Sequence, residues 1–214
     1  MRILVIETST TACSVALLES GAVVARAHDV VGRGHAERLI PMIADLPGGG
    51  RADRILVDCG PGSFTGVRVG IAAARGLALG WGAEIAGFSA LPLIAAAGFA
   101  DRPTGDIAVV LEGGHGEVFT QAFSADLTPR DPMVSLKPDA ALAALAGRRA
   151  VGNGVRWLAA LDDRLDLTEA LPDAASAILL PAALTSLSPR PIYGRAPDAK
   201  PAATRTAMQT QPSV

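Results

Sequence analysis

Aromatic residues and cysteine are scarce in this 214-residue chain. Phe, Trp and Tyr together make up 4% of the residues, whereas the apolar set as a whole makes up 50% and the mean hydropathy is +0.34. Such a composition excludes a disordered chain and favours an aliphatic globular core. The two cysteines, Cys13 and Cys59, lie in apolar, strand-like contexts, and we expect them to be reduced core thiols.

Positive charge is not in excess either. The formal net charge is −2, the only lysines are Lys137 and Lys200, and the arginines of the first third are interspersed with acids. Proteins that bind nucleic acid unaided draw most of that affinity from clustered Lys and Arg that neutralise phosphates. Independent nucleic-acid binding is therefore not expected.

The histidines are too few and too far apart for a helical metal pair. They are His28, His35 and His115, and no two of them stand four residues apart. Two imidazoles on one face of a helix require that spacing. We expect no metal site.

The apolar stretches are too interrupted or too short for a membrane or export segment. Residues 69–100 are largely apolar, but Arg75, Glu84 and Pro92 interrupt them, which favours a buried helix–strand–helix run. The N-terminal strand pattern meets Glu7 after four apolar residues, too soon for a signal-peptide core. These features predict a cytoplasmic protein without a membrane partner.

Apolar runs and turn residues predict one order of elements twice. In the first half, strands are expected at 3–6, 13–18, 22–27, 55–57 and 84–87, and helices at 35–46, 65–80 and 89–99. After residue 106, strands at 107–111, 118–123, 133–136 and 149–152 and helices at 138–146 and 155–161 repeat the opening order, three strands, helix, strand, helix. The repetition predicts an internal duplication.

The duplication divides the chain into two expected lobes. The first covers residues 1–101 and the second, smaller one covers 102–188, with a last helix over 173–186 that contains Pro181. Residues 189–214 form a tail rich in Pro, Ala, Thr and Ser, which we expect to be mostly disordered.

The glycine run Gly60-Pro61-Gly62-Ser63-Phe64-Thr65-Gly66 joins a predicted strand to a predicted helix. Glycines at such a junction allow tight turns and expose backbone N–H groups that can hold a phosphate. The run is neither a Walker A loop, because Val67-Arg68 follows Gly66, nor a dinucleotide fingerprint, because Thr65 occupies the third glycine position. A structural turn and a phosphate-binding loop both remain open.

Four segments together resemble the TsaB family, whose members act in the modification of a tRNA adenosine. They are residues 6–9 (Ile-Glu-Thr-Ser), residues 35–41 (His-Ala-Glu-Arg-Leu-Ile-Pro), the glycine run with the following Val-Arg, and residues 191–195 (Pro-Ile-Tyr-Gly-Arg). The resemblance is close over residues 1–100 and follows mainly strand order from 101 to 195. It implies an α/β, actin-like (ribonuclease H-like) fold of duplicated lobes, each a mixed sheet flanked by helices.

The resemblance also implies a role without catalysis. A TsaD-like paralogue would transfer threonylcarbamoyl to the adenosine next to the tRNA anticodon, and this chain would activate it as a scaffold. A TsaE-like ATPase would act on the complex, the chain alone would be a homodimer, and tRNA would be reached only through the complex. No catalytic residue, metal or cofactor is expected in this chain alone, although ATP or ADP is possible in the complex. TsaD holds its metal with His-x-x-x-His, and the corresponding residues here, 88–94, contain no such ligand.

Two groups of residues are candidate sites. Small residues along the second predicted helix, Gly66, Gly70, Ala73 and Ala74, would let another helix approach, from the same chain or a partner. The resemblance implies a partner interface on the first two helices, at His35, Glu37, Leu39, Pro41, Met42, Ile43, Val67, Arg68, Gly70, Ile71 and Ala74. A possible phosphate or nucleotide loop comprises Glu7, Thr8, Ser9, Gly60, Gly62, Ser63 and Thr65.

Several single residues keep a second interpretation. Glu7 resembles the acid that orients a magnesium nucleotide in actin-like kinases, but a carboxylate in a polar turn is as often a cap. His35, at a helix start, is by default a solvated or capping residue, and the resemblance makes it a candidate interface residue. Arg68 can hold a phosphate, a partner's carboxylate or a neighbour in a local ion pair, which is the default. Relatives usually carry Asp-Ala-Arg where this chain has Glu112-Gly113-Gly114, so the role of that segment does not carry over. The alternative function is a small actin-like ATPase or a sugar or acid kinase.

Overall fold

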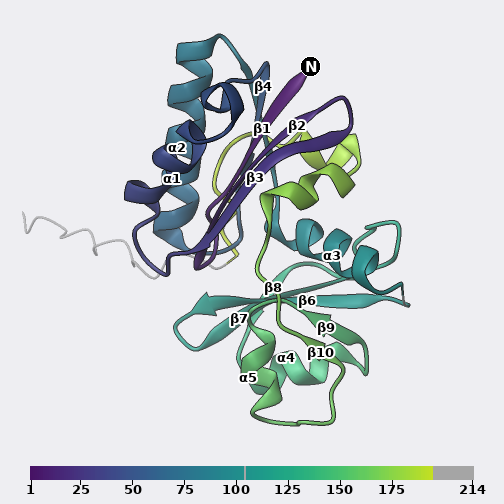
Figure 1. Cartoon of the computed structure of the whole chain (residues 1–214). Coiled ribbons are helices and arrows are strands. Elements are labelled where there is room, and N and C mark those ends of the chain that lie inside the picture. Colours follow the sequence, from purple (N-terminus) through teal and green to yellow (C-terminus); the bar gives the residue numbers. More distant parts are fainter. Residues whose placement is uncertain (104, 195–214) are drawn as a thin grey trace, which may run out of the picture.

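Two lobes stacked end to end make up the structure, a computed structural model that describes residues 1–103 and 105–194 (Figure 1). The sheet of the first lobe contains β1 (Arg2–Glu7), β2 (Ala12–Glu19), β3 (Ala22–Val30), β4 (Arg54–Asp58) and β5 (Glu84–Phe88) in the order β3-β2-β1-β4-β5. The three consecutive strands β1, β2 and β3 pair antiparallel, whereas β4 and β5 join in parallel. The carboxyl ends of β1 and β4 therefore meet at one edge of the sheet.

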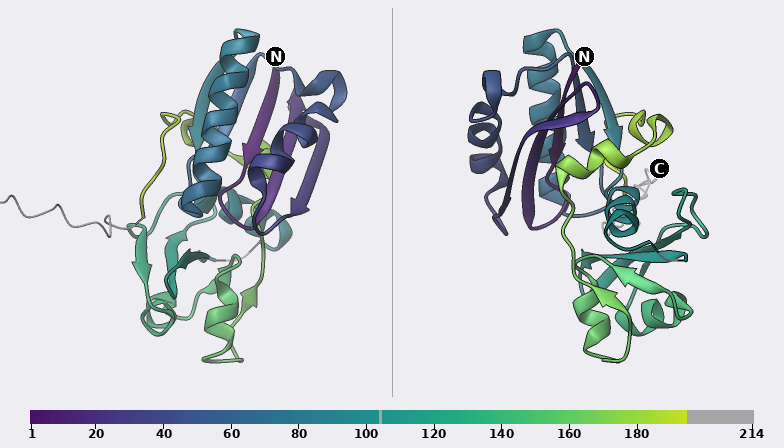
Figure 2. Two further views of the ribbon diagram at one scale, coloured as in Figure 1. Left: turned by 90° about the vertical axis from the view of Figure 1, so that its left-hand side faces the viewer. Right: turned by 45° about the vertical axis from the view of Figure 1, so that its right-hand side comes forward.

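Helices cover both faces of the first sheet. One face of the sheet carries α1 (His35–Ala44), a short 3-10 turn η1 (Pro47–Gly50) and α2 (Phe64–Trp81). On the other face, α3 (Ala90–Asp101) lies between the two lobes (Figures 1 and 2). Because side chains alternate along a strand, Leu4 and Ile6 of β1 pack under α1 and α2, and Val5 packs toward α3.

The second lobe repeats the first on a smaller scale. Its strands are β6 (Ile107–Gly114), β7 (Glu117–Phe123), β8 (Val134–Leu136), β9 (Arg149–Val151) and β10 (Leu167–Thr168), and its helices are α4 (Pro138–Leu145) and α5 (Val155–Ala159). The sheet order β8-β7-β6-β9-β10 matches the first sheet strand for strand, with the same parallel and antiparallel neighbours. The predicted duplicated, actin-like α/β fold is confirmed, and β10 is a strand that the sequence pattern did not predict.

The chain returns to the first lobe after β10. Two 3-10 helices, η2 (Ala174–Leu179) and η3 (Ala182–Thr185), stand where one helix over 173–186 was predicted. That prediction was wrong because Pro181, at the start of η3, interrupts the helical hydrogen bonds. The Ser14 Oγ and Asp173 side chains fix the start of η2 against β2. Residues 170–185, assigned by pattern to the second lobe, thus pack largely on the first.

A C-terminal strap, defined as residues 186–194, runs beside α2 (Figure 2). Leu187 exchanges backbone hydrogen bonds with Gly87 of β5, and the Ile192 N–H donates to the Cys59 carbonyl. Gly194 contacts Phe119 of β7, since a Cβ on Gly194 would lie 2.4 Å from that ring. The strap therefore connects the two lobes. The rest of the predicted tail, residues 195–214, lies outside the described residues.

Both cysteines are buried and free, as predicted. Burial raises the pKa of the Cys13 and Cys59 thiols to about 11, so neither is a reactive thiolate. Within the described part of the chain, no helix is both long and apolar enough to cross a bilayer.

Candidate functional site

The glycine run forms a tight turn between β4 and α2. The Gly60–Pro61 peptide bond is cis, Gly60 has a φ of 91°, and the Ser63 hydroxyl caps α2 by accepting from the Gly66 N–H at 3.2 Å. A helix start capped in this way has one donor fewer to offer a ligand.

The inner side of this turn is filled by the chain itself. The Ser63 N–H donates to the Ser9 carbonyl at 2.6 Å, and the Thr8 hydroxyl donates to the Gly66 carbonyl at 2.8 Å. A Cβ on Gly62 would lie 2.1 Å from the Ser9 carbonyl oxygen, and a Cβ on Gly66 would lie 2.0 Å from that of Thr8. The glycines are thus required for close backbone packing, and no phosphate fits between the turn and residues 8–9.

Most of the predicted phosphate-loop residues are accordingly enclosed. Glu7, Thr8, Ser9 and Gly60 are buried, whereas Ser63 and Thr65 are exposed at the start of α2. Of the predicted set, Ser9, Gly62 and Ser63 line the neighbouring cleft. A nucleotide could reach only the outer side of the turn.

Below the turn, Glu7 and Asp58 form a buried carboxyl pair at the ends of the parallel strands β1 and β4. Glu7 Oε1 accepts from the Ser9 N–H and hydroxyl, both at 2.6 Å, and Asp58 Oδ1 accepts from the Gly60 N–H at 2.9 Å. The two remaining oxygens, Glu7 Oε2 and Asp58 Oδ2, are buried without another donor. Burial raises the pKa of Glu7 well above its ordinary value and that of Asp58 to about 6. Because both carboxyls are buried and the Asp58 charge acts on Glu7, the structure favours keeping a proton on the pair.

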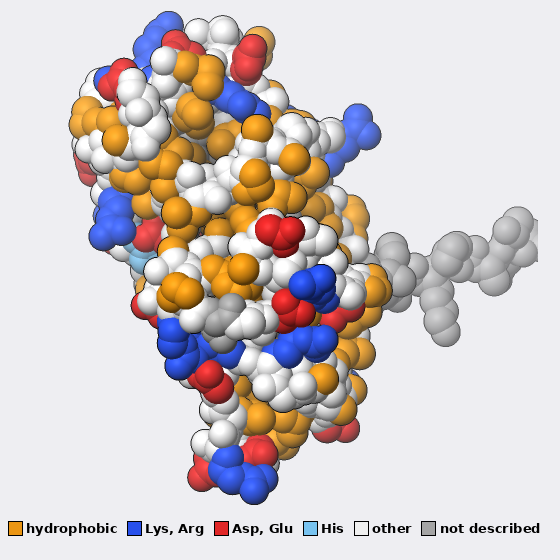
Figure 3. Space-filling view, turned by 90° about the vertical axis from the view of Figure 1, so that its right-hand side faces the viewer, with side chains coloured by type: hydrophobic (Ala, Val, Ile, Leu, Met, Phe, Trp, Pro, Cys, Tyr) orange, Lys and Arg blue, Asp and Glu red, His pale blue; other side chains and the backbone are white. Residues whose placement is uncertain are grey.

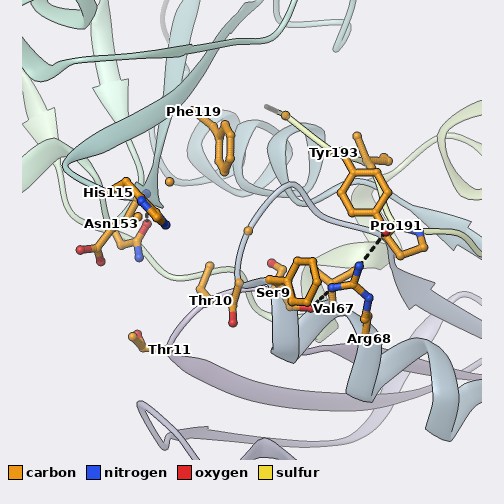
Figure 4. Close-up of a pocket in the computed structure, with 18 of the residues that line it drawn as sticks. Ser9, Thr10, Thr11, Val67, Arg68, His115, Phe119, Asn153, Pro191 and Tyr193 are labelled. Carbon is orange, nitrogen blue, oxygen red and sulfur yellow. Dashed lines mark hydrogen bonds between the residues drawn. The ribbon is translucent and has the colours of Figure 1, made fainter. Parts of the chain in front are cut away.

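A cleft of about 880 Å³ separates the lobes beside this turn (Figure 4). The first lobe contributes the polar segment 9–11, Arg33 and the start of α2, the second contributes residues 112–115, Phe119 and Asn153, and the strap contributes 191–194. Its acid, Glu112, is already paired with Arg156 at 2.6 Å. The cleft is therefore positively charged with several apolar walls.

Arg68 links α2 to the strap at the edge of this cleft. Its guanidinium donates to the Phe64 carbonyl at 3.1 Å and to the Tyr193 hydroxyl at 2.8 Å (Figure 4). The same group stacks on the Phe64 ring, 3.2 Å from its centroid, and lies 5.7 Å from that of Tyr193. The local ion pair considered for Arg68 is absent within the described residues, because hydroxyl, carbonyl and ring contacts replace it.

The predicted partner-interface set is largely enclosed within the first lobe of this chain. Eight of its residues are buried inside the first lobe: His35, Leu39, Met42, Ile43, Val67, Gly70, Ile71 and Ala74. The apolar stripes of α1 and α2 face their own sheet, and His35 Nε2 lies 3.0 Å from the Ala12 carbonyl as a core hydrogen bond. Only Glu37, Pro41 and Arg68 reach the surface.

Other residues form the exposed sides of these two helices. Ile40 is 48% exposed on α1 and Leu79 is 87% exposed on α2, and Ala72 and Gly76 are also exposed. Together with Pro41, these residues are called the outer face below. The signal in the sequence was the apolar character of α2 on more than one side, since a helix that only covers a sheet is polar on its far side.

Helix α3 carries no candidate ligand. The histidine pair of a TsaD-like metal site would fall within residues 88–94, where apolar side chains fill the core between the lobes, Phe88, Leu91, Leu93 and Ile94 among them. No cluster of His, Cys, Asp and Glu suited to a metal ion occurs in residues 1–103 and 105–194.

Comparison with known proteins agrees with this geometry. The profile of the family described as TsaD, tRNA N6-adenosine threonylcarbamoyltransferase, matches residues 27–135, which is half of the chain. The tRNA threonylcarbamoyladenosine biosynthesis protein TsaB of Escherichia coli (strain K12) is 38% identical over 132 residues, and that of Haemophilus influenzae is 35% identical over 124 residues. The chain belongs to the TsaD family, in its TsaB (YeaZ) branch.

The solved structures of TsaB relatives extend the match to almost the whole fold. YeaZ from Pseudomonas aeruginosa superposes with a TM-score of 0.73 at 26% identity, covering 90% of this chain and 99% of that one. A second Pseudomonas aeruginosa structure, described as similar to peptidase YEAZ, gives a TM-score of 0.75. By sequence, the alignments cover 59% and 56% of this chain and 56% and 52% of the two curated TsaB proteins, so the chain spans about half the length of the curated relatives it matches.

Proposed function

We propose that this chain is a non-catalytic subunit of the system that makes tRNA threonylcarbamoyladenosine, where it binds and activates a TsaD-like paralogue. The paralogue would transfer threonylcarbamoyl to the adenosine next to the anticodon, and a TsaE-like ATPase would act on the assembly. Membership in the TsaB branch supports the pathway.

The outer face is the observation that carries the scaffold role. Leu79, near the end of α2, is 87% exposed. Burying such an apolar side chain against a partner would stabilise the assembly. Ala72 and Gly76 beside it are small, so a partner helix can approach closely. The same face serves for a second copy of the chain when the paralogue is absent, which gives the proposed homodimer.

The absence of metal-binding side chains on α3 supports a non-catalytic role for this chain. Apolar residues pack this helix against both lobes, and a metal-binding imidazole pair there would lie in the core. The catalytic chemistry would then belong to the paralogue.

Reconstitution tests the proposal. The purified full chain alone should transfer no threonylcarbamoyl to an unmodified tRNA transcript, and the TsaD-like partner should need this chain for full activity. Full activity of the partner without the chain would refute it. Size-exclusion chromatography with and without ATP or ADP would show whether nucleotide acts in the assembly.

A nucleotide-dependent enzyme is the second candidate. The cleft favours it, because its cationic and apolar walls suit a nucleotide, whereas the closely packed turn at Gly62 and Gly66 leaves no phosphate space on its inner side. ATP turnover, or a melting shift of the isolated chain on adding ATP, would support this function over the first.

A further inference from the structure

Arginines on one side of α2 differ in their partners from most others in this molecule. Among the residues that the structure describes, eight arginines form ion pairs with carboxylates, from Arg2–Glu19 to Arg164–Asp162. Arg75, by contrast, donates to the Pro189 carbonyl at 2.8 Å, and Arg68 contacts the Phe64 carbonyl and Tyr193. Arg190 is exposed in the strap between these two contacts, and its side chain has no carboxylate partner within the described residues. We name Arg68, Arg75 and Arg190 the arginine strip.

The two described segments that carry this strip lack acidic residues. Neither Asp nor Glu occurs in residues 59–83, which include α2, or in residues 174–194, which include the strap. The two segments lie side by side, joined by the Arg68 and Arg75 contacts (Figure 2). In a chain whose net charge is −2, these two adjoining segments thus contain arginines and no acid. Figure 3 shows the opposite side of the molecule, where acidic and basic side chains are interspersed.

Exposed aromatic rings accompany the positive charge. Phe64 is 69% exposed and Tyr193 is 62% exposed, and both flank the Arg68 guanidinium. An arginine beside exposed rings can hold a phosphate while a ring stacks on an unpaired base. An RNA strand gives each of these features a role, because its phosphates suit the arginines and its unpaired bases suit the exposed rings.

We infer that the arginine strip binds the phosphate backbone of the RNA substrate when this chain is assembled with its partner. This inference rests on the proposed function, because three guanidinium groups on an acidic chain are too few to hold RNA firmly without the partner. The strip borders the outer face, so RNA bound there would also lie next to the docked partner.

The test compares RNA affinity at several salt concentrations. The assembled complex is titrated with an unmodified tRNA transcript at about 50 to 200 mM salt, with the wild-type chain or with Arg75→Gln/Arg190→Gln. Glutamine removes the charge and keeps a polar side chain. Each lost phosphate contact reduces the magnitude of the negative slope of log K against log salt by about 0.7–0.9. The slope of the double variant should therefore be smaller in magnitude than that of wild type by about 1.5. Arg51→Gln, an exposed arginine that precedes β4, is the matched control and should leave the slope unchanged.

Assembly is measured separately and without RNA. If the double variant assembles normally and its slope equals that of the wild type, the inference is overturned while the proposed function stands. If the double variant loses assembly without RNA, the strip binds protein instead, and the inference also falls. Should the wild-type chain not assemble with the TsaD-like partner at all, the proposed function is overturned, and the inference that rests on it falls with it.

Discussion

Glu7 and Asp58 are 51 positions apart in sequence and form a buried carboxyl pair at the base of the glycine turn. The pair orders Ser9 and Gly60 through its outer oxygens, and these residues position the turn and the first residues of α2. The buried pair therefore links the core of the first lobe to the surfaces used in both proposals.

The pair makes stability depend on pH. Unfolded Asp and Glu titrate near pH 4, whereas the folded pKa is about 6 for Asp58 and well above the ordinary value for Glu7. Above pH 4 the folded chain holds protons that the unfolded chain has lost, so the contribution to stability is complete below pH 4 and decreases as pH rises through 6. Urea unfolding at pH 4.5 to 7.5 should show this decrease.

Glu7→Gln should remove most of this dependence, because the amide keeps the Ser9 contacts and donates to Asp58 without titrating. Between the ordinary Glu pKa and the raised pKa of Glu7 in the folded chain, the unfolding free energy of the variant should rise relative to that of wild type. The rise should be about 1.4 kcal/mol per pH unit. Glu37→Gln, an exposed change on α1, is the control. A Glu7→Gln curve parallel to that of wild type would show that the folded pair does not keep a proton.

Gly66→Ala should destabilise the chain by about 3 kcal/mol or more, because its Cβ would lie 2.0 Å from the Thr8 carbonyl oxygen. Gly76→Ala in the same helix meets nothing within 4 Å and should stabilise by about 0.5–1 kcal/mol. Urea unfolding measures both. Equal stability of the two variants would mean that the turn is not packed on residues 8–9.

Leu79→Glu and Ala72→Glu should leave thermal stability within about 0.5 kcal/mol, since both positions are exposed. They should abolish assembly with the TsaD-like partner by placing a charge in a covered apolar contact. Leu161→Glu, 52% exposed on the second lobe, should assemble normally. Assembly is read by size-exclusion chromatography, and intact complexes with both α2 variants would argue against the outer face.

Arg149 holds the end of α3 to the second sheet. Its side chain is 3% exposed and donates to the Gly98 carbonyl at 3.0 Å and to the Thr168 hydroxyl at 3.2 Å. Arg149→Ala should cost roughly 3 kcal/mol, because buried charged hydrogen bonds are lost and carbonyls are left unpaired. Arg102→Ala, which breaks an exposed ion pair with Asp166, should cost at most about 1 kcal/mol in the same unfolding assay.

The order of elements was readable from the sequence because it depends on local periodicity. Strand-length apolar runs, the helical stripe of α1 and the glycines after β4 each depend on neighbouring residues, and they predicted two copies of one topology. The helix predicted over 173–186 failed for an equally local reason, since Pro181 cannot donate to a helical bond.

Tertiary structure alone decided which side of each helix is outside. The apolar stripes of α1 and α2, which include Leu39, Ile43 and Ile71, could pack against a partner or against their own sheet. In the structure they pack in the core of the first lobe. The neighbours of Glu7 likewise depend on the parallel pairing of β1 with β4, and the partners of Arg75 depend on the return of the strap. Periodicity determines what an element is, whereas contacts between distant segments determine what it faces.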